Sequence, residues 1–507
     1  MAEKLKKRTG LGRWLALAIA GCVLLPIVSI AWMGFGSDGA RWAHLLATVF
    51  PRYLSNSLSL MLGVGAVSLV LGTSLAYLVT HLEFQGRKWV QYGLFFPLAM
   101  PSFVAAYAWV DVLEYAGPLQ TTLRDLAGWS SVREYWFPNI RSLPGAIFVL
   151  SLTLYPYVYL LARASFRELP ASGQDVARSL GLGHMRQFLR VSLPQARPAI
   201  AAGTAIVMME TLNDFGTVDY FAVQTLTTGI FSIWLESYDP GGAAQLALLA
   251  ALIVAGLLGV EKIGRRRARF NKSGRQMAPI QPQPLSSRQG ATVLVYCLVP
   301  IVLGFLSPLL VLVAPVVSDF NLWHDPGLWR AAGHSLALGS LSAGLVVVLA
   351  TVMVLGVRKI SGAWKKSLLT LTTLGYAFPG AVLGLGILIP LAAFDNWLAD
   401  LFFATFRLDP GLLLTGTAGA LIIAYCVRFF AIGVGAAEAG LAAISTNIPL
   451  AASTLGHPPR DVVLNIYQPL IPGSLASAMV PVPYTHLPLT PQQLLWTAVY
   501  PGYLANQ

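Results

Sequence analysis

Residues 172–200 read SGQDVARSLGLGHMRQFLRVSLPQARPAI, a polar, arginine-bearing stretch between two strongly apolar runs. Ser172 and Asp175 have the spacing of a helix-capping box, and an acidic residue there faces the positive end of the helix dipole. Gly181 stands where that short helix is expected to end. Pro194 and Pro198 are expected to prevent the next polar run from continuing as one helix. The stretch therefore predicts helix, glycine turn, helix, and a candidate docking surface.

The composition around this stretch is that of a membrane protein. Of the 507 residues, 56% are apolar and 11% are charged, and many apolar runs approach the length of about 20 residues that crosses a bilayer. Core helices of a soluble protein would be polar along one side, which these runs are not. The net charge of +12 comes largely from basic residues in loops beside apolar runs. This positive-inside pattern favours anionic lipid, and not nucleic acid, as their partner.

The spans are expected in two similar sets. Basic residues precede the first apolar run, which is too long for a cleaved signal peptide, so we expect an uncleaved span with the N-terminus in the cytoplasm. We predict an all-α polytopic fold of about 11–12 transmembrane helices. The clearest spans are expected at about 14–34, 57–80, 90–112, 143–164, 199–216, 243–260, 291–317, 335–357, 367–393 and 411–435.

A basic and proline-rich segment separates the two sets. It predicts a first transmembrane domain over 1–262, a cytoplasmic linker over 263–290 and a second transmembrane domain over 291–507. The segment after Pro481 lacks the apolar run that the first half would predict, so we expect a truncated or altered C-terminus. The three cysteines, Cys22, Cys297 and Cys426, lie in apolar runs without metal or pairing spacing.

Constant offsets connect the two halves. Ser57 and Ser335 are 278 positions apart, as are Pro101 and Pro379. Further along, matched residues are 275 positions apart; these pairs are Gly181 with Gly456 and Pro194 with Pro469. Such offsets indicate an internal repeat. Because both halves have the same predicted orientation, the repeat is parallel, which differs from the inverted repeats of many carriers.

The duplicated stretch resembles the EAA motif of ABC-importer permeases, which is written EAA, three residues, G, nine residues, I, one residue, LP. We name residues 175–194 the first motif and residues 450–469 the second motif. The frame falls on Asp175, Val176, Ala177, Gly181, Val191, Leu193 and Pro194, and again on Leu450, Ala451, Ala452, Gly456, Ile466 and Pro469. Asp175 keeps the acidic position and Leu450 loses it.

The resemblance implies two fused type I ABC-importer transmembrane domains in a bacterial inner membrane. Each motif is then expected to contact one of two separate ATPase subunits and to transmit ATP-driven closure to the spans. The residues implied in this coupling are Asp175, Ala177, Gly181, Pro194, Ala451, Ala452, Gly456 and Pro469. The chain has no GxxxxGK[ST] sequence, so no cofactor is expected in it and ATP belongs to the partner. A periplasmic substrate-binding protein and the lipid bilayer complete the expected partners; no catalytic residue is assigned.

The layout is also similar to that of ferric-iron permeases, with thiamine, phosphonate and polyamine permeases as alternatives. Glu210, Asn213 and Asp214 lie near the end of an apolar run, where they either line the translocation path or cap a helix at the outer interface. Pro101 and Pro379 place helix breaks within apolar runs and are further candidates for the path. No cluster has metal-ligand spacing. A gradient-driven secondary transporter and a membrane-embedded enzyme are the alternatives from other classes; few mid-span charges and no paired catalytic cluster count against them.

Overall fold

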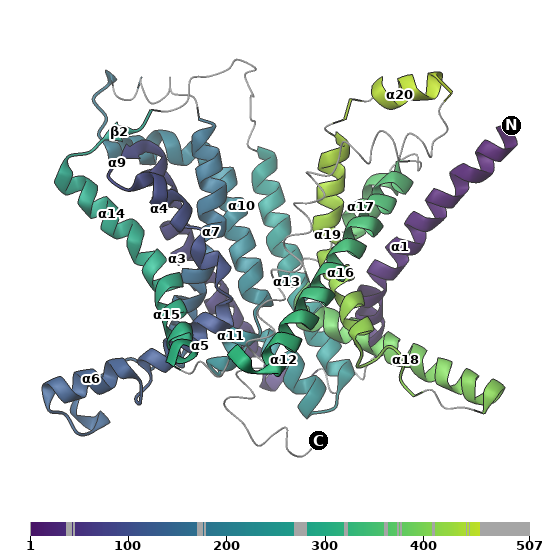
Figure 1. The fold of residues 1–507 in the computed structure, drawn as a ribbon, viewed down its shortest axis with the longest axis horizontal. Coiled ribbons are helices and arrows are strands. Elements are labelled where there is room, and N and C mark those ends of the chain that lie inside the picture. The colour runs from purple at the N-terminus through teal and green to yellow at the C-terminus, as the bar shows by residue number, and fades with distance from the viewer. Residues whose placement is uncertain are drawn as a thin grey trace. The chain divides into compact units, whose positions relative to one another are not determined.

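The computed structural model describes residues 2–36, 43, 46–169, 176, 179–267, 281–318, 323–358, 364–372, 375, 378–407, 411–442, 444–445 and 447–456. One two-residue parallel ladder joins β1 (Leu82–Glu83) to β2 (Gln283–Pro284), and the other regular elements described are helices (Figure 1). The predicted all-α polytopic class is confirmed.

Contacts divide the chain into two compact units. The α3 unit comprises Gly39–Ser237 and Leu249–Phe320, and the α16 unit comprises Met1–Asp38, Tyr238–Leu248 and Asn321–Gln507. These units are not the two continuous halves of the sequence, because each contains the first helix of the other half. The boundary at 263–290 thus remains a prediction about the repeat, and residues 268–280 lie outside the described part of the chain.

The core of the α3 unit is a bundle of α3 (Phe50–His81), α7 (Leu143–Arg167) and α10 (Leu193–Asn213). Gly72 and Gly203 allow close approach, since a Cβ on either would lie 2.7–2.8 Å from Val158 atoms of α7. Tyr155 and Tyr159 are fully buried in α7. Their hydroxyls donate to the carbonyls of Leu94 (3.1 Å) and Gln91 (2.9 Å), so the polar ends of these rings are satisfied inside the apolar core.

Shorter elements surround this bundle. They are α4 (Arg87–Gly93), η1 (Phe96–Ala99), α5 (Ser102–Leu113), α6 (Pro118–Ala127), η2 (Val132–Glu134), α9 (His184–Gln187), η3 (Phe188–Ser192), α11 (Gly216–Tyr220), α12 (Leu226–Phe231) and η4 (Ser232–Glu236). α13 (Pro240–Arg267) has residues in both units.

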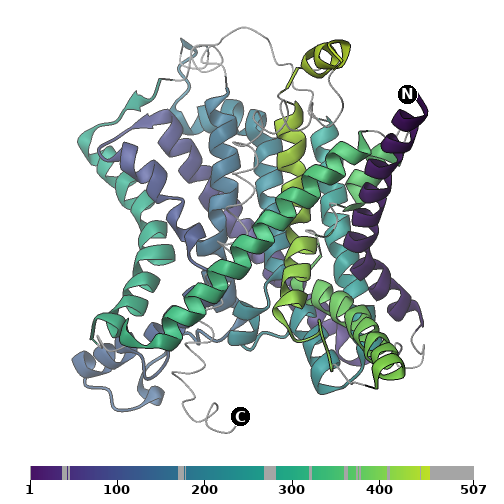
Figure 2. The ribbon, with the colours of Figure 1, turned by 45° about the vertical axis from the view of Figure 1, so that its right-hand side comes forward.

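The first helix of the second half belongs to the α3 unit. It runs as α14 (Ser287–Ile301), the π segment η5 (Val302–Leu306) and α15 (Ser307–Ser318), with α14 next to α4 in Figures 1 and 2. The Trp109 indole N–H donates to the Leu303 carbonyl (3.2 Å), and a Cβ on Gly304 would lie 2.8 Å from the Leu152 carbonyl oxygen. This helix therefore packs against spans of the first half.

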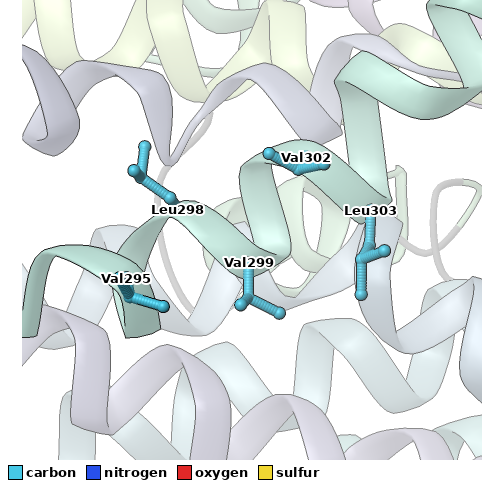
Figure 3. Close-up of a pocket in the computed structure, with 5 residues that line it drawn as sticks. All are labelled: Val295, Leu298, Val299, Val302 and Leu303. Atoms are coloured by element: carbon cyan, nitrogen blue, oxygen red, sulfur yellow. The ribbon is translucent and has the colours of Figure 1, made fainter. Parts of the chain in front are cut away.

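One side of that helix stays open. Val295, Leu298, Val299, Val302 and Leu303 line a shallow groove of about 260 Å³, shown in Figure 3. All five side chains are aliphatic, which suits contact with lipid acyl chains along a membrane-spanning helix.

The α16 unit has the reciprocal arrangement. α1 (Ala2–Gly36), the first helix of the chain, packs against α16 (Pro326–Val357) and α18 (Gly380–Phe406). Gly356 meets the Gly12 carbonyl oxygen, and a Cβ on Gly386 would lie 2.5 Å from the Pro26 carbonyl oxygen. The unit also contains α17 (Trp364–Thr372), α19 (Ala418–Ala442) and α20 (Asn447–Thr454).

Eight helices in the described part of the chain are long and apolar enough to cross a membrane, and a pair bent by 91°, Arg87–Ala99 with Ser102–Ala127, makes a possible ninth. About 11–12 were expected. The expected span at 199–216 forms α10, which is not one of the eight, and that at 367–393 is divided between α17 and α18. Residues after Gly456, including the expected altered C-terminus, lie outside the described part.

The helix breaks predicted at Pro101 and Pro379 are present. Each proline directly precedes a helix, α5 or α18, with closely similar backbone angles (φ −58°, ψ 136° and φ −52°, ψ 143°). A proline fixes φ and provides no N–H, so it suits the position before a helix. The offset of 278 thus joins two positions with the same local structure.

Candidate functional site

The first motif presents a helical turn that ends at a glycine. The Leu180 N–H donates to the Val176 carbonyl (3.1 Å), and the Ser179 hydroxyl donates to the same carbonyl (2.9 Å). Gly181 follows with φ +73°, the left-handed conformation that ends helices. The predicted glycine turn is present. Leu180 is 73% exposed, so the turn holds a large apolar side chain out of the unit.

The second motif repeats this geometry 275 residues later. The Leu455 N–H donates to the Ala451 carbonyl (3.0 Å), and the Thr454 hydroxyl donates to that carbonyl (2.7 Å). Gly456 has φ +84°, and Leu455 is 78% exposed. Each of these residues corresponds to its counterpart in the first motif, so the repeat includes backbone geometry as well as sequence. Ala452 is buried beneath the turn and Ala451 is exposed.

Several predicted coupling residues lie outside the described part of the chain. These are Asp175, Ala177 and Pro469, and the predicted cap at Ser172 lies outside it too. Their roles stay predictions.

The region around Pro194 differs from expectation. We predicted that Pro194 and Pro198 would interrupt the second polar run, but α9, η3 and α10 follow one another as one helical path. The reason is the π segment, in which the Leu193 N–H donates to the Phe188 carbonyl five residues earlier. A π turn widens the helix just before Pro194, which accommodates a ring that would clash with an ordinary α turn.

An aromatic cluster, not predicted from the sequence, fixes the first motif to the bundle. Phe188 lies 4.7 Å from Tyr77 of α3 between ring centroids, and Tyr77 stacks on His81 at 4.2 Å. Phe166, at the end of α7 and fully buried, meets Tyr77 (6.0 Å) and His81 (5.5 Å) edge-on. Motion of η3 would therefore be transmitted to α3 and α7 directly. The four residues come from three distant segments, and no local pattern links them.

Several large apolar side chains of the first motif are exposed. Val176, Met185 and Leu189 are more than half exposed, as is Leu180. Large apolar side chains left exposed in this number are typical of surfaces that bind another molecule.

The predicted path residues of the α3 unit divide into two groups. The Ser102 hydroxyl donates to an Asp214 carboxylate oxygen (2.6 Å), which places the start of α5, just after Pro101, beside Asp214. Asp214 also accepts from the Thr217 N–H (2.8 Å) and hydroxyl (3.0 Å). Asp214 therefore accepts hydrogen bonds from the first turn of α11.

Glu210 and Asn213 are half-buried at the end of α10. The Asn213 Oδ1 atom is buried and accepts no hydrogen bond within the described part of the chain. A buried polar atom without a hydrogen bond destabilises the fold. Its presence at Asn213 therefore suggests that this position is kept for a functional role.

In the α16 unit, Pro379 is buried before α18. Arg428 of α19 lies beside Gly380, where a Cβ would be 2.6 Å from the arginine Nη1 atom. This arginine was not predicted as a site residue, although one cation within an apolar run is a visible signal. The described residues contain no group of three or more His, Cys, Asp or Glu side chains that could hold a metal ion.

Comparison with known proteins identifies the family. Residues 52–269 match the binding-protein-dependent transport system inner membrane component family. The chain is 25% identical over 431 residues to the Fe(3+)-transport system permease protein FbpB 2 of Haemophilus influenzae, covering 84% of this chain and 77% of the relative. It is also 25% identical over 367 residues to the thiamine transport system permease protein ThiP of that organism, covering 69% and 66%. Identity to the molybdenum transport system permease protein ModB of Escherichia coli is 26% over 230 residues, covering 43% and 97%.

The family match covers the first motif and nearly all of the bundle of α3, α7 and α10, and the longest of these alignments extends through most of the second half. Residues 52–269 therefore form a domain of the binding-protein-dependent transport system inner membrane component family, and the chain is a multi-pass permease of an ABC importer.

Proposed function

We propose that this permease carries ferric iron across the inner membrane. It would receive the iron from a periplasmic binding protein and be driven by two ATPase subunits, one at each motif, with its N-terminus in the cytoplasm. The observation that carries the coupling proposal is the pair of turns ending at Gly181 and Gly456, which share hydrogen bonds, left-handed glycines and exposed leucines. Similarity to FbpB 2 over most of the chain supports iron as the substrate.

Each turn suits a mechanical contact. A leucine side chain that moves from water into a partner's groove stabilises the contact by about 1.5–3 kcal/mol. Because a glycine in the left-handed region ends the helix directly after this leucine, the side chain stands at the tip of the motif. The first motif would bind its ATPase subunit more strongly, since Asp175 keeps an acidic group where the second motif has Leu450.

The first motif is also well placed to move the spans. Phe188 contacts Tyr77 of α3, and η3 continues into α10 without a break. A displacement of the loop would then shift two helices of the bundle together. We propose that Glu210, Asn213, Asp214 and Pro101 in the α3 unit, and Pro379 in the α16 unit, respond to this shift and border the translocation path.

The test is transport by the full chain in proteoliposomes with a periplasmic binding protein and ATPase subunits from the same source organism. We expect uptake of radioactive iron that requires ATP inside the vesicles and persists when ion gradients are collapsed by ionophores. Uptake that continues without ATP and stops with the gradient would contradict the ABC mechanism and indicate a secondary transporter.

Substrate choice needs a separate arm in the same vesicles. Thiamine, 2-aminoethylphosphonate, a polyamine and molybdate are offered in turn with the same binding protein. ATP-dependent uptake of one of these, without iron uptake, would replace ferric iron in the proposal. The thiamine arm is the most informative, because similarity to ThiP covers 69% of the chain.

A further inference from the structure

The helix α6 (Pro118–Ala127) turns its polar side toward the protein. Gln120 is buried, its amide donates to the Leu113 carbonyl (2.7 Å), and it accepts from the Tyr135 hydroxyl (2.6 Å). Arg124 donates to the Tyr115 carbonyl (2.8 Å) and to the Tyr135 hydroxyl (3.0 Å). Two polar side chains of α6 are thus bonded inside the α3 unit.

The opposite side of α6 is apolar and open. Leu119, Leu123 and Leu126 recur at helical spacing and form one stripe, and Leu126 is 82% exposed. Trp136, just after η2, is 86% exposed. A water-facing helix has the reverse pattern, with apolar residues inward. The leucine side chains of the stripe are therefore expected to lie against an apolar environment, either lipid or another protein.

The elements next to α6 indicate that this apolar environment is lipid. Only four residues, 114–117, separate α6 from α5. Ser102–Ala127 is the second part of the bent helix pair that is long and apolar enough to cross a membrane. The stripe is thus continuous with a membrane-embedded segment. Trp129 stacks on Tyr135 at 5.0 Å next to the exposed Trp136, and aromatic residues of this kind gather at membrane–water interfaces.

Within the α3 unit, α6 lies at the end away from α9 and the first motif, in both views (Figures 1 and 2). It therefore belongs to the membrane face opposite that motif. The exposed side offers aliphatic and tryptophan side chains for nonspecific burial, while Gln120 and Arg124, which could give specificity toward a protein, are already bonded internally.

We propose that α6 and η2 form an interfacial segment that lies in the lipid headgroup region on that face, with Leu119, Leu123 and Leu126 in the acyl boundary. An amphipathic helix of this type binds the bilayer through its buried apolar area. The segment anchors the outer end of the bent pair at a fixed depth.

The experiment measures depth at two neighbouring positions of the full chain. A nitroxide is attached to Leu126→Cys or to Asp125→Cys, with the exposed Cys22 replaced by serine and the unsubstituted parent as a blank. Asp125 is the matched control because it is also exposed on α6 but lies off the stripe. The protein is placed in nanodiscs of phosphatidylethanolamine and phosphatidylglycerol, and collision rates with oxygen and with a water-soluble nickel chelate are compared.

We expect the ratio of oxygen to nickel collisions to be several-fold higher at position 126 than at position 125. Equal ratios at both positions, with free access to nickel, would overturn the proposal, since the stripe would then face water. Protection of position 126 from both reagents would overturn the proposal, because the stripe would then be covered by protein. A collision ratio at position 126 that rises only when a periplasmic binding protein is added would overturn it for the same reason. Leu119→Cys provides an independent second position, expected to follow position 126.

Discussion

Gly181 and Gly456 have backbone φ angles of +73° and +84°, which place both in the left-handed region. A side chain with a Cβ there costs about 1–2 kcal/mol, and a β-branched one is a particular outlier. Because no atom of the described residues lies within 4 Å of either glycine's Cβ position, the penalty expected for a substitution is conformational and not steric. The glycines are therefore required by the turn itself.

We expect Gly181→Val to displace Leu180 and to weaken capture of the ATPase subunit by the detergent-solubilised permease, several-fold in a titrated pull-down. Gly456→Val should weaken it less, because the second motif has lost the acidic position. Gly183→Val is the matched control, since Gly183 is equally open but has no left-handed φ. Equal capture by the Gly181 and Gly183 variants would refute the role of the turn.

The aromatic cluster predicts that docking and transport can be separated by one substitution. Phe188→Ala removes the ring that contacts Tyr77 but leaves the turn at Leu180 unchanged. We expect ATPase capture to persist, while iron uptake per ATP hydrolysed falls several-fold, because η3 no longer moves α3. Vesicle uptake and phosphate release, measured together, give this ratio.

Phe148→Ala is the control for that experiment. Phe148 is also in an aromatic pair, at 5.3 Å from Trp109 between ring centroids, and in the described part of the chain its ring pairs with no aromatic residue of the first motif. A parallel fall in the ratio for both variants would mean that general loss of packing, and not the cluster, is responsible.

At the scale of the helix, the contact of α1 with α16 depends on Gly356, which meets the Gly12 carbonyl oxygen. Even one added methyl group has no room there, and overpacking of this kind costs about 1–3 kcal/mol. We expect Gly356→Ala to lower the thermal unfolding midpoint of the purified permease. Gly344→Ala in the same helix should leave it unchanged, because no atom of the described residues lies within 4 Å of that Cβ position. If the two variants unfold at the same temperature, α1 does not make this contact.

The sequence predicts elements best where the signal is local. The turn at Gly181 and the breaks at Pro101 and Pro379 follow from backbone chemistry of single residues, and each is present. The π segment before Pro194 could not be predicted, because a proline permits either a break or a widened turn and the surrounding packing decides between them. The cluster of Tyr77, Phe166 and Phe188 depends on three helices meeting, which no spacing encodes.

At the scale of the whole molecule, the repeat predicted two similar halves but not their packing. α1 packs in the α16 unit, and α14 with α15 packs in the α3 unit. Because the hydrophobic pattern is repeated, the first helices of the two halves have the same pattern of apolar residues. That pattern therefore does not predict which half each of these helices will contact. Glycines at the crossings, such as Gly356 and Gly304, are compatible with either arrangement until their partners are known.

This exchange predicts that neither half is stable alone. A chain divided before Met277 yields fragments 1–276 and 277–507. The first fragment would lose the α14–α15 cover of α5 and α7, and the second would lose α1 from α16 and α18. We expect each fragment expressed separately to be degraded or to aggregate, and the two expressed together to copurify through a tag on one of them.

Deletion of residues 2–36 from the first fragment is the control, and it should reduce copurification strongly, because α1 provides the contact with α16 and α18. Fragment 1–276 that is monodisperse on its own, and unfolds at the temperature of the intact chain, would show that the exchanged helices do not stabilise the fold. Burial of apolar surface stabilises a fold by about 25 cal/mol for each Å². Loss of a whole helix interface should therefore lower the unfolding temperature of the fragment measurably.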